Sequence, residues 1–292
     1  MKADTDVEAR RPLGVSLSEL LPWWIGLCLI AVLAWVATIT WVGPMGVGPG
    51  TMGLSLAAFL FVWVVMMTAM MFPSVAPMAI VWIRSVGARP TTQGRFAGIA
   101  SFLAGYLIVW TLFGVVVYAV LLGAGMLADS APDKARWAGA AIFAVAGVYQ
   151  FLPLKNVCLR HCRTPVGSLF HYASYKGPAR DLRVGMHHGL YCVGCCCGLM
   201  IVLIAVGAMN IPAMLALAGV ILIEKVWRYG PAFSRAVGAF LLVAAVLVPF
   251  VPSLLPGLDR APMAPMVPMS PMSPSPVTPS PMSPISPDVT VM

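Results

Sequence analysis

The sequence predicts an all-α protein, a polytopic bundle of about seven transmembrane helices. Two observations lead to this fold class. The 292-residue chain is 60% hydrophobic but only 10% charged, and its mean hydropathy is +0.91. A soluble domain of this length needs far more surface charge. Since a span takes about 20 mostly apolar residues, we expect spans at Leu21–Val42, Leu54–Ile83, Ile99–Leu127, Trp137–Leu154, His188–Gly207, Pro212–Val226 and Phe233–Val251.

Lysine and arginine residues predict the orientation. If residues 1–20 form a cytoplasmic N-terminal segment, 15 of the 18 basic residues fall in cytoplasmic segments, and only Lys134, Arg136 and Arg260 lie outside. This bias sets topology and predicts a multi-pass protein of the plasma (inner) membrane, with its N-terminus inside and its C-terminus outside. It also accounts for the net charge of +8, so we expect no nucleic-acid partner. The first apolar run begins late and is too long for a cleavable signal peptide.

The transmembrane domain, residues 21–252, is followed by a tail of Met, Pro and Ser at 253–292, which we expect to be disordered and extracytoplasmic. Met263, Met266, Met269 and Met272 recur every third residue and would align on one edge of a polyproline II helix. The tail is either a strand whose thioethers loosely capture a soft metal ion or a plain spacer.

Six of the seven cysteines gather near one face of the membrane. The stretch "CVGCCCGLM" places Cys192, Cys195, Cys196 and Cys197 at the cytoplasmic end of the fifth span. The stretch "KNVCLRHC" places Cys158 and Cys162 in the adjoining inner loop. This side is reducing, so the thiols should stay reduced and a disulfide framework is not expected.

The spacing of residues on an α-helix predicts which of these thiols share a face. Positions i, i+3 and i+4 share a face, so one stripe of the fifth span carries His188, Cys192, Cys195, Cys196, Leu199 and Met200, and Cys197 points away from it. Cys158, His161 and Cys162 share a face if their segment is helical. The alternative is that cysteine is simply a small residue that lets helices pack closely. We assign only this packing role to Cys28.

The second span holds an array of methionines in "WVVMMTAMMFPSVAPM". Met66 and Met70 lie one turn apart, as do Met67 and Met71. Pro73 and Pro77 should bend the helix near them. Methionine is also a common core residue, so packing remains an alternative. Beside the thiols, the thioethers favour Cu(I), because soft sulfur ligands select it.

A zinc site remains an alternative to a Cu(I) site. Cys158, His161, Cys162 and one thiol of the fifth span could supply its four ligands.

Four segments resemble a copper-linked bacterial family of predicted metal-binding integral membrane proteins. They are "VMMTAMMFPSVAPM", "GVYQFLPLKNVCLRHCRTP", "GLYCVGCCCGLM" and "GAMNIPAM…EK", within about residues 60–226. The resemblance implies metal handling in a membrane but no reaction. It links to the metal Met67, Met70, Met71, Cys158, Cys162, Cys192, Cys195, Cys196, Met200, Met209 and Asn210. Cys197 departs from the family, which more usually has tryptophan there.

Other polar groups in the spans are costly in lipid. Gln150 needs a partner, and Asn210 is placed to cap the helix that begins near Pro212. Glu224 and Lys225 end the sixth span, where we interpret them as a pair that snorkels to the cytoplasmic interface.

Together these features predict an integral membrane protein that handles Cu(I), as a chaperone, in delivery or in transport. The predicted metal residues are Cys158, Cys162, Cys192, Cys195, Cys196, Met67, Met70, Met71, Met200 and His188. Its expected partners are the lipid bilayer and a metal-donor or metal-acceptor protein. No catalytic constellation is present, so we do not expect an enzyme. The alternatives are a membrane thiol–disulfide oxidoreductase that uses Cys192 and Cys195, or a structural subunit of a membrane complex.

Overall fold

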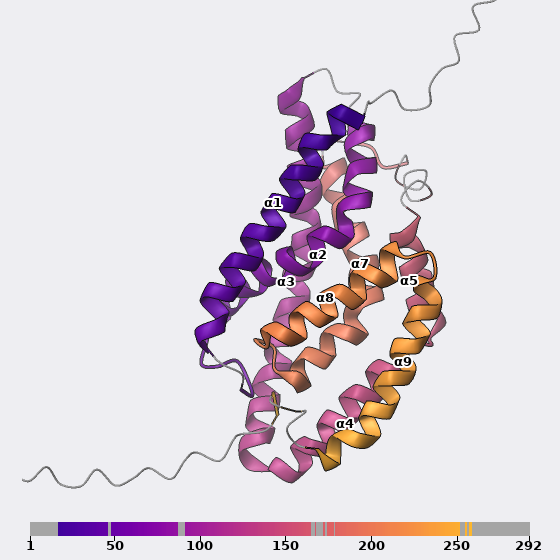
Figure 1. Ribbon diagram of the computed structural model, residues 1–292. Coiled ribbons are helices and arrows are strands. Elements are labelled where there is room, and N and C mark those ends of the chain that lie inside the picture. Colours follow the sequence, from indigo (N-terminus) through magenta and orange to yellow (C-terminus); the bar gives the residue numbers. More distant parts are fainter. Residues whose placement is uncertain are drawn as a thin grey trace, which may run out of the picture. The chain divides into compact units, whose positions relative to one another are not determined.

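The computed structural model describes residues 17–45, 48–86, 91–164, 167, 172, 174–177, 179–251, 255 and 257–258. Within these residues the protein is helical and contains no strand, which confirms the predicted all-α fold class (Figure 1). The predicted N-terminal segment up to residue 16 and the Met-rich positions of the tail lie outside the described residues. The helices are α1 (Leu17–Val42), α2 (Leu56–Val86), α3 (Thr92–Ser130), α4 (Pro132–Tyr149), α5 (Pro153–Arg163), α7 (Arg180–Val206), α8 (Ile211–Val226) and α9 (Gly230–Leu247), with 3-10 turns at Gly43–Met45 and Val248–Phe250.

Five of these helices are long and apolar enough to cross a membrane: α1, α2, α3, α7 and α9. Helices α4 and α5 would together make a sixth crossing, although they are bent by 63° at the break between them. Helix α8, with 16 residues, is shorter than each of these five helices and is not among the candidate spans. The prediction of seven spans and the inside–outside assignment therefore stay predictions.

Pro153 causes the break between α4 and α5. Proline has no N–H to donate and disfavours helical geometry in the residue before it. Accordingly, Leu152 is extended, with φ −66° and ψ 142°, and Pro153 begins α5. The predicted span Trp137–Leu154 thus ends in a sharp turn. The segment that contains Cys158 and Cys162, predicted as part of an inner loop, forms a helix of its own.

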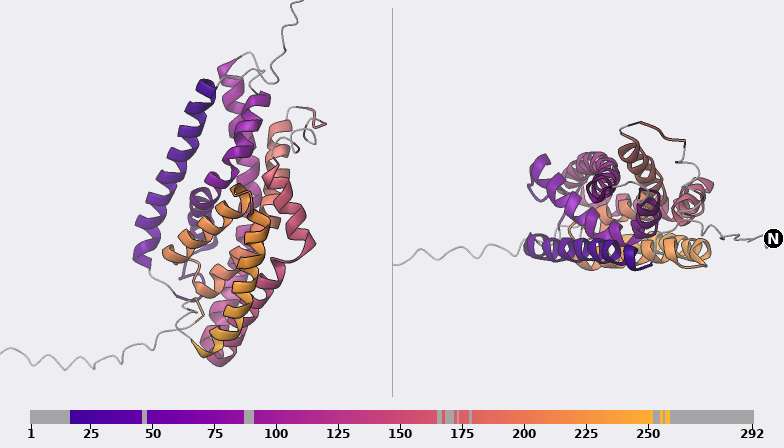
Figure 2. Two further views of the ribbon diagram at one scale, coloured as in Figure 1. Left: turned by 45° about the vertical axis from the view of Figure 1, so that its right-hand side comes forward. Right: turned by 90° about the horizontal axis from the view of Figure 1, so that it is seen from above.

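Helix α7 is the most buried of the five candidate spans and packs against α3, α4, α5 and α8. Its closest neighbour is α3, because glycines face each other there. A Cβ atom at Gly105 of α3 would overlap the backbone at Leu182, and one at Gly185 of α7 would overlap the backbone at Phe102. Small residues of this kind let two helices approach closely. Helix α1, in contrast, contacts α2 and lies on the side away from α5 (Figure 2).

The outer faces of the bundle are apolar. Leucine, isoleucine, valine and phenylalanine side chains on α1, α3 and α9 are widely exposed, as with Leu33, Leu112 and Phe240. Exposed apolar surface of this extent is rare on soluble monomers and indicates contact with a membrane or with other chains.

A buried ion pair joins α5 to α8, which corrects our interpretation of Glu224. Lys155 and Glu224 are each 1% exposed, and Lys155 Nζ lies 2.8 Å from Glu224 Oε2. Lys155 also donates to Gln150 Oε1, which accepts a further bond from Ser234 Oγ at 3.0 Å. Gln150 therefore has the partner that we expected it to need. Glu224 does not snorkel, because α5 folds over it and brings a lysine within reach.

Candidate metal centre

Three thiols of α7 form a buried cluster. Cys192, Cys195 and Cys196 are at most 1% exposed, and their sulfur atoms all lie within 4.8 Å of one another. The Sγ atoms of Cys195 and Cys196 are 3.4 Å apart. The i, i+3, i+4 spacing produces this arrangement directly, so the predicted stripe is present. We call these three residues the thiol cluster.

Helix α5 adds a fourth thiol at the edge of the cluster. The Sγ atom of Cys162 lies 3.8 Å from that of Cys195. Cys158, one turn earlier, faces Gly194 instead: a Cβ atom on Gly194 would lie 2.7 Å from its Sγ. The missing side chain at Gly194 thus lets α5 approach α7. Cys158 is buried beside the thiol cluster but is not one of its three members.

Two polar side chains from other helices reach Cys192. Tyr106 of α3 places its hydroxyl 3.0 Å from Cys192 Sγ. Lys225 of α8 donates to Cys192 Sγ at 3.1 Å and to Ser74 Oγ of α2 at 3.1 Å. The cluster therefore lies where α2, α3, α7 and α8 meet, with a buried cation against one thiol.

The position of Lys225 corrects our interpretation of it as a snorkelling residue. Its ammonium group is buried among Ser74 and Cys192 instead of extending to the interface. A buried ammonium group is costly unless it finds hydrogen-bond or charge partners. A charged residue in an apolar segment is by itself a sign of a functional site, and that sign could have identified Lys225. No feature of the sequence around Tyr106 indicated that this residue lies at the candidate metal centre.

His188 lies on the same stripe, one turn before Cys192, and is 2% exposed. Its Nδ1 atom is buried and has no hydrogen-bond partner among the described residues. An unsatisfied buried nitrogen costs about 1–3 kcal/mol, but His188 is not part of the group that the three thiols form, so its role as a ligand stays a prediction. Its ring centroid lies 6.3 Å from that of Tyr106, which itself contacts Cys192.

His161 is held by aromatic residues. Its ring stacks on Tyr191 with centroids 3.9 Å apart, and its Nε2 lies 2.7 Å from the hydroxyl of Tyr172. Burial raises the pKa of Tyr172 above its ordinary value, so this phenol keeps its proton. Among the described residues, no group of potential ligands unites His161 with Cys158 and Cys162, which gives the predicted zinc set no support.

The predicted methionines are all buried and belong to the same hydrophobic core as the thiol cluster. Met67, Met70 and Met71 of α2 and Met200 of α7 are at most 1% exposed, as is Met66. The α2 array approaches the cluster through Ser74, whose hydroxyl donates to Met71 O at 2.8 Å and accepts from Lys225. Burial fits both packing and ligation, so their role as ligands stays a prediction.

Three other residues singled out in the sequence are Asn210, Cys197 and Cys28. Asn210 caps α8, as expected: its Oδ1 accepts from Ala213 N at 3.1 Å, and Pro212 lies in the first turn. Cys197 is only half-buried and lies outside the thiol cluster. Cys28 is exposed on α1 and lies outside the thiol cluster, so its assigned packing role stays a prediction.

The donor set fits a soft metal ion. The cluster offers three sulfur atoms, and Cys162 adds a fourth nearby. Thiolate sulfur selects Cu(I), zinc or iron–sulfur clusters over hard cations. A family comparison narrows this choice.

The sequence model of a family described as a copper chaperone, PpoB2, matches residues 60–248, more than half of the 292-residue chain. The chain belongs to this family. No curated protein and no solved structure matches it. The match confirms the resemblance to a copper-linked family.

The part of the chain that matches the copper chaperone family runs from α2 to the end of α9. It contains the thiol cluster, Cys162, Lys225 and the α2 methionines, and it leaves out α1. The matched region therefore contains every residue that forms the candidate centre, and Cys28 of α1 lies outside it.

We predict that Cys162 and Cys195 can be joined by mild oxidation. In a variant that retains only these two cysteines, the sulfur atoms 3.8 Å apart need only a small approach to form a bond of about 2.05 Å. Mass spectrometry of the digested protein should find the cross-linked peptides of α5 and α7. A variant that retains only Cys28 and Cys195 should remain reduced. Failure of the first variant to cross-link would show that α5 does not pack against the thiol cluster as described.

Proposed function

We propose that this protein is an integral membrane Cu(I)-binding protein that accepts the ion at Cys192, Cys195 and Cys196 and hands it to a partner protein. The observation that carries the proposal is the thiol cluster: three buried sulfur atoms within 4.8 Å of one another in a chain of the copper chaperone family. Such a cluster can surround one soft ion and exclude water and competing ligands from it.

The ligand chemistry favours Cu(I) over zinc. A structural zinc ion takes four ligands in a tetrahedral arrangement, whereas Cu(I) is satisfied by two or three sulfur atoms. The thiol cluster supplies three sulfurs from one helix, and its fourth neighbour, Cys162, lies at the edge. Methionine thioethers nearby on α2 suit Cu(I) and do not suit zinc.

Lys225 is suited to balance the charge of the bound ion. Cu(I) held by two thiolates carries one net negative charge, and placing it in an apolar bundle is costly unless a cation is near. The ammonium group of Lys225 lies 3.1 Å from Cys192 Sγ. Its hydrogen bond to Cys192 also favours the deprotonated thiol that a metal ion requires.

Cys162 is suited to be the transfer thiol. It is on the short helix α5, 3.8 Å from Cys195, and it is more exposed than any of the three cluster thiols. Because two-coordinate Cu(I) readily accepts a third thiolate, the ion can pass from Cys195 to Cys162 by ligand exchange without becoming free. A partner protein would then receive it at the end of α5.

The membrane setting is part of the proposal. Five apolar helices and a widely exposed apolar surface support a multi-pass protein. The bias of basic residues supports the plasma (inner) membrane, with α5 and the start of α7 at the cytoplasmic face. Thioethers at Met67, Met70, Met71 and Met200 would offer Cu(I) weaker ligands than the thiols along the interior.

The alternative of a thiol–disulfide oxidoreductase has less support. Reactive cysteines of such enzymes are partly exposed so that a substrate thiol can reach them. Cys192 and Cys195 are at most 1% exposed. We therefore propose metal handling without a catalytic reaction.

Replacing two cluster thiols, Cys192→Ser/Cys196→Ser, should abolish tight Cu(I) binding. We expect the affinity measured by competition with a chromophoric Cu(I) chelator to fall by more than about a hundredfold, since changing even outer-shell partners of a metal costs about 10–100-fold. Cys28→Ser and Cys197→Ser serve as controls and should bind as the wild type does. Equal affinities for all four proteins would refute the proposal and favour a structural role for the cysteines.

Lys225→Gln should weaken Cu(I) binding by about 10–100-fold, the range measured for groups that contact a metal ligand. Glutamine keeps a hydrogen-bond donor but has no charge and no sulfur atom, so the variant removes the countercharge without adding a Cu(I) ligand. The control is Ser74→Ala, which removes a neutral hydrogen-bond partner of Lys225 and keeps the charge; its affinity should stay within about threefold of the wild type. If Lys225→Gln binds Cu(I) as tightly as the wild type, the lysine has only a structural role.

A further inference from the structure

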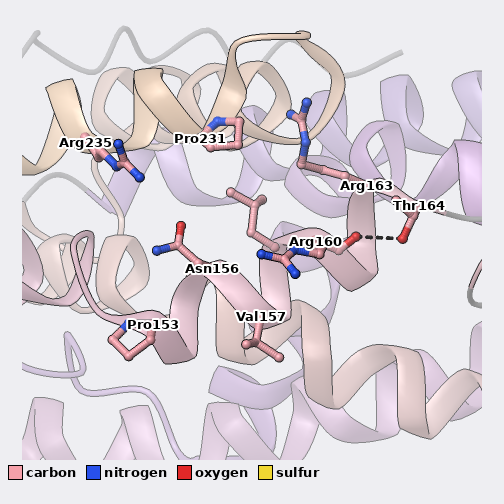
Figure 3. A pocket seen from close by; sticks show the side chains of 9 residues that line it. Pro153, Asn156, Val157, Arg160, Arg163, Thr164, Pro231 and Arg235 are labelled. Atoms are coloured by element: carbon pink, nitrogen blue, oxygen red, sulfur yellow. Dashed lines mark hydrogen bonds between the residues drawn. The ribbon is translucent and has the colours of Figure 1, made fainter.

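A basic pocket lies between α5 and the start of α9. It encloses about 550 Å³ and is lined on one side by Asn156, Arg160 and Arg163 of α5 and on the other by Pro231 and Arg235 of α9. Figure 3 shows the side chains of Asn156 of α5 and Arg235 of α9 on facing sides of the pocket, with Arg160 further along α5. The pocket lies outside the thiol cluster, and copper handling does not account for it.

The charges in this pocket are of one sign. Three arginines line it and no acidic side chain does. The guanidinium group of Arg163 already makes hydrogen bonds within the protein, because it donates to Glu224 O and, at 3.3 Å, to Arg228 O. Within the described part of the chain, the guanidinium groups of Arg160 and Arg235 have no hydrogen bond or ion pair. Two guanidinium groups therefore remain free to bind an anion.

The surroundings of the pocket are apolar. Leu154 and Val157 of α5 are 59% and 56% exposed next to the arginines. Trp227 and Tyr229, in the turn before α9, are exposed as well. Tryptophan and tyrosine are enriched where a membrane meets water, at the level of the lipid headgroups. In the predicted topology the arginines would lie at the level of the lipid phosphate groups, with the exposed apolar side chains of α5 beside them for acyl chains.

We propose that this pocket binds the phosphate group of an anionic phospholipid. Arginine presents a planar fork of donors that matches phosphate oxygens, and basic pockets between membrane helices on the cytoplasmic side suit anionic headgroups. The phosphate would be shared by Arg160 and Arg235, and the acyl chains would lie along Leu154 and Val157. This inference is independent of copper binding.

Such a lipid would join α5 to α9. Helix α5 contains Cys162, whose Sγ lies 3.8 Å from that of Cys195, and its Arg163 already contacts the end of α8. A bound phosphate would fix the same helix from its outer side. The protein should therefore become more resistant to heat when the lipid binds.

The test is a lipid titration of the full chain in detergent, followed by native mass spectrometry. Phosphatidylglycerol is compared with phosphatidylcholine of the same acyl chains. We expect the wild type to retain one phosphatidylglycerol preferentially, and we expect Arg160→Gln/Arg235→Gln to weaken this binding by about tenfold, the effect of losing charge-assisted hydrogen bonds. Arg235→Gln alone, a milder change in an exposed side chain, should lose less.

The matched control is Arg228→Gln. It removes one positive charge near the same interface, from a residue that does not line the pocket, and it should bind phosphatidylglycerol as the wild type does. Thermal unfolding in the presence of inorganic phosphate distinguishes a lipid from a free anion. Equal binding of the two lipids, equal loss in the control, or the same stabilisation by inorganic phosphate as by phosphatidylglycerol would overturn the proposal.

Discussion

The ammonium group of Lys225 is the point at which the helices around the candidate metal centre depend on one another. The Lys225 side chain extends from α8, and its ammonium group donates to Ser74 of α2 and to Cys192 of α7. An ammonium group buried in an apolar bundle must have such partners, because leaving it alone costs several kcal/mol. Three helices are therefore fixed relative to each other by one charge, and that charge lies against the thiol cluster.

The preceding residue, Glu224, extends the same constraint to α5. Consecutive residues on a helix point in different directions, so Glu224 reaches Lys155 of α5 while Lys225 reaches α7. The end of α8 thus holds α5 and α7 at once. Cys162 and Cys195, the two thiols suited to exchange the ion, belong to these two helices. Moving α5 away from α8 would separate the two buried charges of the Lys155–Glu224 pair, which costs several kcal/mol.

The sequence predicts the parts of this arrangement that are local. High hydropathy and little charge predict the helical fold class, and the period of the helix predicts the stripe that becomes the thiol cluster. Asn210 before Pro212 predicts a cap through contacts within one turn. These features follow from a single helix and need no knowledge of its neighbours.

The remaining parts depend on contacts between distant segments. Tyr106 lies 86 positions before Cys192 in the chain, and nothing in its own segment indicates a metal centre. The snorkelling interpretation of Glu224 and Lys225 is wrong because α5 and α2 cover the end of α8, which the sequence alone does not reveal. Gly194 matters only because Cys158 packs on it. Tertiary packing decides each of these cases.

The most direct test of copper coordination by the thiol cluster is X-ray absorption at the copper K-edge of the Cu(I)-loaded protein in detergent. Sulfur and nitrogen ligands differ in bond length and in scattering, so the spectrum identifies the donor atoms without depending on affinity. We predict a shell of two or three sulfur atoms, which disappears when Cys192, Cys195 and Cys196 are replaced by serine. A shell dominated by nitrogen or oxygen, or a sulfur shell that persists in that variant, would contradict the account.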